Sequence, residues 1–189
     1  MNLAKQYKEC WGFLKENLNY VITAFFIFVF FGLVGFIFPV FFEKEISVLI
    51  EKMVAMFDGV GLLETILKIF LNNLKASSLM ILFGGVLGLL PLIAAISNGY
   101  ILGFVARRAV SSEGIFILWK LFPHGIFELP AVILSIGIGL KLGVDILKKD
   151  GWKFFKKDFL KAMKFFLFVV VPLLIVAGII EGVLVWGLG

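Results

Sequence analysis

Polar side chains with chemical potential occur inside stretches that are otherwise apolar: Asn98, His124, Glu128 and Glu181. His124 and Glu128 belong to "LFPHGIFELPA", where their i, i+4 spacing puts an imidazole and a carboxylate on one helix face. An ionisable group inside a bilayer costs about 3 kcal/mol or more unless it is paired or protonated, so each is a functional candidate. With Glu181 they could bind a divalent metal such as zinc, share a proton or act as an acid/base pair.

A purely structural role for this cluster is an equally open hypothesis, since a buried His–Glu pair can simply fix helix positions. The spacing H-x-x-x-E is not the zinc motif H-E-x-x-H, and the single cysteine, Cys10, adds no metal cluster. No catalytic residue is therefore assigned, although Glu128 and Glu181 are candidates. Asn98 precedes Gly99 and is predicted to form a turn, with the lining of a substrate path as the alternative.

The segments that must position these side chains are typical of membrane spans. Hydrophobic residues make up 61% of the chain and charged residues 16%, whereas soluble domains are roughly half apolar and a quarter charged. Residues 20–42, 76–106 and 165–180 contain no charged side chain. Because about 20 apolar residues cross the hydrocarbon layer as a helix, the chain is predicted to be polytopic. The expected fold class is an all-α transmembrane bundle with about five membrane-embedded segments and amphipathic interfacial helices.

We expect one membrane domain over 1–189, and its predicted segments are an N-terminal interfacial helix (1–19), span 1 (20–42), outer amphipathic helices (43–75), span 2 (77–106), a third segment (98–121), span 4 (124–146), a basic interfacial helix (148–164) and a last span (165–188). The third segment has two interpretations. Either 77–96 and 98–121 both cross, or 77–106 is one tilted span and 113–140 is a re-entrant hairpin.

The net charge of +5 is concentrated in residues 141–164, which hold eight lysines and three aspartates. A basic flank of a membrane span is commonly a topology signal and a contact for anionic lipids, and this explanation is favoured over nucleic-acid binding. The lysines expected to contact lipid are Lys148, Lys149, Lys153, Lys156, Lys157 and Lys161. By the positive-inside rule, a multi-pass protein of the cell membrane is expected, with its N-terminus cytoplasmic and its C-terminus outside. Side-chain amides are few, which suggests a heat-adapted source.

Small residues recur at intervals of four in the apolar segments. One stripe contains Ala131, Ser135, Gly139 and Gly143, and shorter ones pair Gly84 with Gly88, Gly99 with Gly103, and Gly178 with Gly182. Small residues let helix backbones approach closely in lipid, so these stripes predict a tightly packed bundle. A surplus stripe could also serve a homo-oligomer or a partner protein.

Several segments together resemble the stage II sporulation protein M family: "NNL" (72–74), "PLIAAISNGYILG" (91–103), "LFPHGIFELPAVILSIGIGLKLG" (121–143) and "PLLIVAGIIEGVL" (172–184). The resemblance implies an integral membrane protein with about five spans. In spore-forming bacteria it implies a membrane scaffold and partner of peptidoglycan-degrading enzymes during engulfment.

Three functions follow as hypotheses. The first is a scaffold that organises membrane or cell-envelope proteins through its small-residue helix faces. On this hypothesis the protein is not an enzyme. The second is an intramembrane metal-dependent hydrolase that uses His124, Glu128 and Glu181. The third is a small transporter, or a proton or ion pathway, that uses the two carboxylates.

Overall fold

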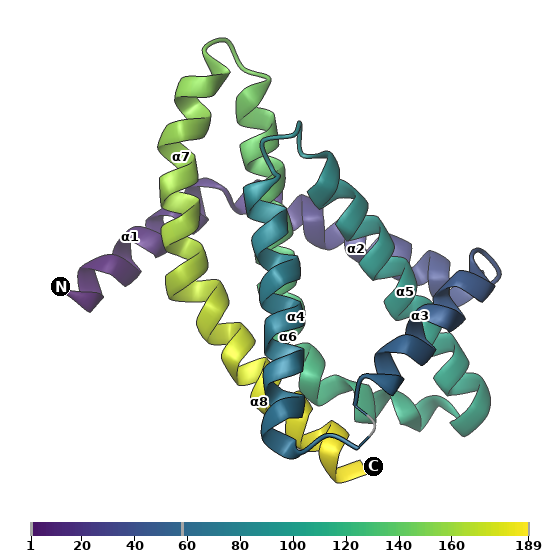
Figure 1. The fold of residues 1–189 in the computed structure, drawn as a ribbon. Helices are drawn as coiled ribbons and strands as arrows, with labels where there is room; N and C mark the ends of the chain where they lie inside the picture. The colour runs from purple at the N-terminus through teal and green to yellow at the C-terminus, as the bar shows by residue number, and fades with distance from the viewer. Residues whose placement is uncertain (1, 58, 189) are drawn as a thin grey trace.

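The protein is helical in the part of the chain that the computed structural model describes, residues 2–57 and 59–188, with the side chains at positions 54, 119–124 and 188 outside that part. No strand occurs among the described residues, and the predicted all-α class is confirmed. In chain order (Figure 1) the elements are α1 (Leu3–Glu16), α2 (Leu18–Ile37), α3 (Glu43–Ala55), α4 (Leu62–Leu82), α5 (Leu89–Glu113), a 3-10 turn η1 (Ile115–Ile117), α6 (Leu118–Ile146), α7 (Gly151–Phe165), a π-helical turn η2 (Phe166–Val170) and α8 (Val171–Leu188).

Five described helices are long and apolar enough to cross a membrane, as the sequence predicted for a polytopic bundle. They are Leu18–Ile37, Leu62–Leu82, Leu89–Glu113, Gly125–Ile146 and Gly151–Gly187. Each contains the roughly 20 residues that span a hydrocarbon layer of about 30 Å. The fold is therefore that of an integral membrane protein.

The predicted span 77–106 is two helices in the structure, because the chain reverses at residues 83–88. Leu87 and Gly88 adopt positive φ angles of 52° and 69°, and glycine tolerates this conformation without steric cost. The turn contains no polar residue, so a hydropathy profile does not distinguish it from the helices on either side. The second crossing helix is instead α4, which includes the part of 43–75 that was predicted to be a second surface helix.

The predicted turn at Asn98-Gly99 is absent, because α5 runs without a break from Leu89 to Glu113. Asn98 uses its side chain within this helix: Nδ2 donates a hydrogen bond of 2.8 Å to the carbonyl oxygen of Ala94. Residues 98–113 of the predicted third segment thus belong to a helix that begins before residue 98, and the described backbone shows no hairpin within 118–140. Instead, the short turn η1 leads into α6.

Helix α6 is the centre of the bundle and contacts α2, α4, α5, α7 and α8. Its residues Ile136, Ile138 and Leu142 are completely buried. In Figure 1, α4, α6 and the α7–α8 helices run alongside one another, whereas α2 and α5 pair closely and lie at an angle to them. Helix α6 joins these two groups and positions the side chains it carries between them.

The glycines of α2 and α5 allow the closest helix contact in the described bundle. A Cβ atom on Gly103 would overlap the carbonyl oxygen of Gly32, and one on Gly35 would overlap that of Tyr100. The Tyr100 hydroxyl donates to the carbonyl oxygen of Phe38 at 2.9 Å, which holds the end of α2 against α5. Backbone contact of this kind is how small residues stabilise helix pairs in lipid.

The small-residue stripe of α6 also packs inside the chain's own bundle. Ala131 and Ser135 are completely buried, and a Cβ atom on Gly139 would overlap the backbone of Met80 in α4. Gly143 lies against the backbone of Gly88 in the 83–88 turn. All four residues of the stripe are buried within the chain, so this stripe is used in the bundle's own packing.

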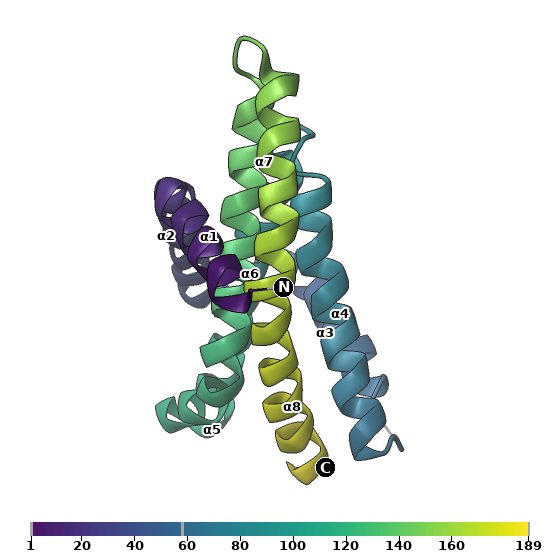
Figure 2. The same cartoon turned by 90° about the vertical axis from the view of Figure 1, so that its left-hand side faces the viewer.

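The predicted basic interfacial helix, residues 148–164, continues into the predicted last span without a bend that would separate the two. Helix α7 continues through η2 into α8, and Figures 1 and 2 show them as one long rod. Together they form one candidate membrane span, Gly151–Gly187, which has 37 residues. At ~1.5 Å per residue this rod is about 55 Å long, well beyond the ~30 Å hydrocarbon layer. Its lysine-rich end lies beside the end of α6.

Helix α1 packs across the rod through Cys10 and Phe13, which are 3% and 4% exposed (Figure 2). Three of its other apolar residues, Leu3, Tyr7 and Trp11, are exposed. This arrangement fits the predicted interfacial helix, whose outer apolar face is free to enter lipid headgroups.

Candidate functional site: a carboxylate pair and a buried ion network

Two of the sequence-predicted site residues come together between α6 and α8. The carboxyl groups of Glu128 on α6 and Glu181 on α8 lie close enough to interact directly. The Oε2 atom of Glu181 is buried and has no hydrogen-bond partner among the described residues. Two carboxylates this close in apolar surroundings repel each other, so a shared proton or a bound cation would stabilise the pair.

Close packing of α8 against α4 holds Glu181 in place. A Cβ atom on Gly178 would approach the Cβ of Phe70 to 3.2 Å, and one on Gly182 would overlap the side chain of Ile66. The predicted Gly178/Gly182 pair is therefore a helix contact within the bundle. Glu181 lies between these two glycines along the chain, so a shift of α8 by even part of a turn would separate the two carboxyl groups.

The third member of the predicted cluster, His124, contributes its backbone to α6, four residues before Glu128. Its side chain lies outside the described part of the chain. Among the described side chains, no three His, Cys, Asp or Glu residues gather as a metal site. A zinc site made by His124, Glu128 and Glu181 therefore stays a prediction.

A second polar centre, which the sequence reasoning missed, lies between α6 and α7. Lys141 is 4% exposed and Asp145 completely buried, and the Nζ–Oδ2 distance between them is 2.5 Å. Lys141 also pairs with Asp158 on α7, and Lys148 binds Asp145 at 2.8 Å. The i, i+4 spacing of Lys141 and Asp145 at the end of an apolar helix is the sequence feature that could have predicted this ion pair.

The same network extends to the lysines predicted to contact lipid. Lys161 lies 3.6 Å from Asp158, and the hydrogen bond that Lys148 donates to Asp145 raises the pKa of Lys148. By contrast, four of the six side chains are exposed and make no ion pair among the described residues: Lys149, Lys153, Lys156 and Lys157. Lys156 lies over the Trp152 ring at 5.3 Å. The lysine-rich end of α7 therefore has a free cationic surface.

The network also anchors α1 to the rod. Lys164 binds Glu9, and this ammonium group holds the pKa of the Glu9 carboxyl below its usual value. Lys161 lies 3.8 Å from Glu16 at the other end of α1. The buried pairs between α6 and α7 contribute mainly to the definition of geometry, because desolvation offsets much of their attraction. The pairs to α1 are largely exposed and add a weaker attraction.

Comparison with known proteins finds one matching family and a distant relative. Residues 21–185 match the family described as stage II sporulation protein M. An uncharacterized protein of Methanocaldococcus jannaschii is 33% identical over 125 residues, which cover 64% of this chain and 55% of that protein. The chain thus spans about half the length of this curated relative. No solved structure matches the chain.

Proposed function

Because the chain belongs to the stage II sporulation protein M family, we propose that it is a non-enzymatic membrane scaffold that holds partner proteins at the bilayer. The observation that carries this proposal is the α6–α7 hairpin, whose two helices are joined by buried ion pairs and whose α7 side carries exposed lysines. A helical hairpin with exposed lysines is suited to docking a protein with an acidic surface. The partner would bind this hairpin and not the small-residue stripes, which are used inside the bundle.

The proposal includes an orientation. Five crossing helices put the two termini on opposite sides of the membrane. The N-terminus and the lysine-rich hairpin lie on the same side, because α2, α4, α5 and α6 separate them. The positive-inside rule makes this the cytoplasmic side, so the C-terminus is outside and the docking hairpin faces the cytoplasm.

Site-specific photo-crosslinking in the source cells tests the scaffold. A photoreactive amino acid at Lys156 is expected to trap a discrete partner, whereas the same probe at Lys52, exposed on α3, is not. The double substitution Lys153→Glu/Lys157→Glu is expected to reduce the adduct at least tenfold, because it replaces attraction for an acidic surface by repulsion.

Stability of the double variant is the control for this experiment. Lys153 and Lys157 are exposed, so the thermal midpoint in detergent is expected to change little. An adduct that persists at full yield in a folded double variant would overturn docking through the hairpin. Equal labelling from Lys52 would likewise show that contact is not specific to this surface.

We propose a second candidate, a proton or cation site at the Glu128–Glu181 pair, because Glu181 Oε2 is buried without a partner among the described residues. On this proposal, purified protein in liposomes carries a proton or cation flux that Glu181→Gln lowers at least tenfold. Glu51→Gln on α3 is the matched control, since it removes an exposed carboxylate away from the spans.

Elemental mass spectrometry of the same samples separates a metal site from a proton site. Stoichiometric zinc that is lost in both Glu181→Gln and His124→Ala would support the hydrolase hypothesis. Flux that is equal in protein-free liposomes and in liposomes with the wild-type protein would contradict the transport role. The scaffold test is independent of either result.

A further inference from the structure

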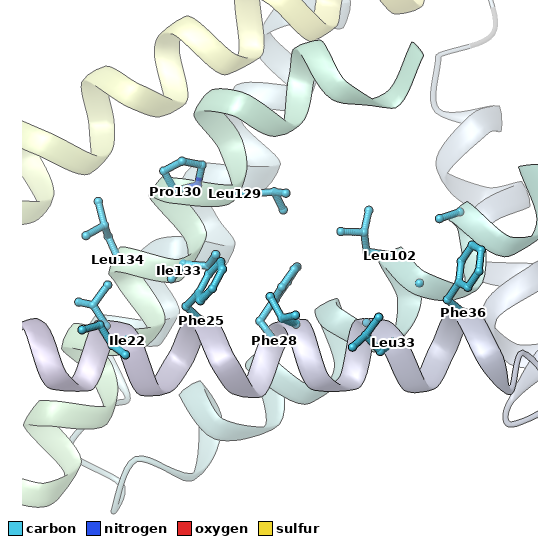
Figure 3. A pocket seen from close by; sticks show the side chains of 15 residues that line it. Ile22, Phe25, Phe28, Leu33, Phe36, Leu102, Leu129, Pro130, Ile133 and Leu134 are labelled. Carbon is cyan, nitrogen blue, oxygen red and sulfur yellow. The ribbon is translucent and has the colours of Figure 1, made fainter. Parts of the chain in front are cut away.

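A wide apolar groove of about 750 Å³ opens between α2, α5 and α6. Figure 3 shows that its labelled walls come from these helices, with Phe25 and Leu33 on α2, Leu102 on α5, and Ile133 on α6. All of its lining residues are apolar, and they run along α2 from Val21 to Phe36. At ~1.5 Å per residue this length is about 22 Å, enough for a fatty-acyl chain that crosses one leaflet.

A polar recess adjoins one end of this groove. It is lined by Glu43, Arg107, Arg108, Ser111 and Ser112, among other residues. The guanidinium of Arg107 lies 5.7 Å from the centre of the Phe36 ring, and Phe36 lines the groove. The cation and the apolar groove therefore meet at the end of α2, where the chain leaves the first span.

The two arginines of this recess differ in whether a protein group already neutralises them. Arg108 lies 3.5 Å from Glu43 and donates to the Ser47 hydroxyl at 2.9 Å. Arg107 makes no ion pair with any described residue and is exposed. An unpaired arginine at a membrane interface is suited to bidentate binding of a phosphate group.

We propose that this groove and recess bind one anionic phospholipid, with an acyl chain between α2, α5 and α6 and its phosphate on Arg107. The groove supplies only apolar contacts, so affinity for a chain comes from packing and headgroup selectivity comes from the arginine. A partner helix fits less well. A crossing helix about 10 Å wide and 30 Å long occupies roughly 2,400 Å³, several times the groove's volume.

Native mass spectrometry in detergent tests the proposal with two lipid probes, dioleoylphosphatidylglycerol and dioleoylphosphatidylcholine. The wild-type protein is expected to retain one phosphatidylglycerol more strongly than phosphatidylcholine. Arg107→Gln is expected to weaken phosphatidylglycerol binding about tenfold and remove the preference, because one charge-assisted contact is lost. Lys52→Gln, which removes an exposed cation of α3 outside the groove and the recess, is expected to change binding less than twofold.

A second variant tests the chain groove. Ala106→Phe places an aromatic ring among the lining residues and is expected to lower binding of both lipids, whereas Ala4→Phe on exposed α1 is not. Thermal melting of each variant confirms folding. Equal retention of both lipids by the wild-type protein, or a preference that survives Arg107→Gln, would overturn the headgroup site. A protein dimer that Ala106→Phe dissociates would instead assign the groove to a second copy of the chain.

Discussion

Lys141→Met is expected to lower the free energy of unfolding by about 3–5 kcal/mol, because it leaves buried carboxylates without their shared cation. Asp145 is completely buried, and Asp158 would keep only the more distant ammonium group of Lys161, 3.6 Å away. Lys148 still reaches Asp145 from a partly exposed position, but it makes no ion pair with Asp158 among the described contacts. The measurement is unfolding by sodium dodecyl sulfate from mixed micelles, followed by circular dichroism.

Two controls define the origin of that loss. Lys153→Met removes an exposed lysine from the same hairpin and is expected to change stability by less than about 0.5 kcal/mol. Lys141→Met combined with Asp145→Leu and Asp158→Leu removes the three least exposed members of the network and is expected to recover much of the stability, because no uncompensated buried charge is left. A single variant as stable as the wild-type protein would refute the burial of Lys141.

The Gly103→Ala substitution is expected to destabilise the bundle by about 3 kcal/mol, although it adds only one methyl group. This methyl group would overlap the carbonyl oxygen of Gly32, and it would also meet the backbone nitrogen of Phe36 at 2.8 Å. Because these neighbours are backbone atoms, no side chain can rotate away, and α2 and α5 must separate along their contact. The same detergent unfolding experiment measures the loss.

Gly12→Ala is the matched control, since a Cβ atom at Gly12 in α1 has no neighbour within 4 Å. Alanine there is expected to stabilise the helix by up to about 1 kcal/mol. Spin labels on the lipid-facing sides of α2 and α5 would report the expected increase in helix separation in Gly103→Ala. Equal stability of the two alanine variants would show that the helices are not in backbone contact at Gly103.

The membrane class, the helical fold and the presence of about five embedded segments could be predicted from sequence because they depend on local properties. An uncharged run such as 20–42 has the length and hydropathy of a span wherever it is placed. Glu128 and Glu181 could also be grouped in advance, because each is a carboxylate inside an apolar segment. The family resemblance rested on short motifs, and the match over residues 21–185 agrees with it.

Features that depend on contacts between residues far apart in the chain could not be predicted from the sequence. The turn at 83–88 is as apolar as the helices beside it, and its backbone lies against Gly139 and Gly143 more than 50 residues later. Whether Lys141 faces lipid headgroups or is buried depends on Asp158 in the next helix. Glycine spacing predicts that helices approach, but it does not say which helices, since every small-residue stripe offers the same shallow surface. Tertiary packing settles these choices by pairing surfaces that are far apart in the chain.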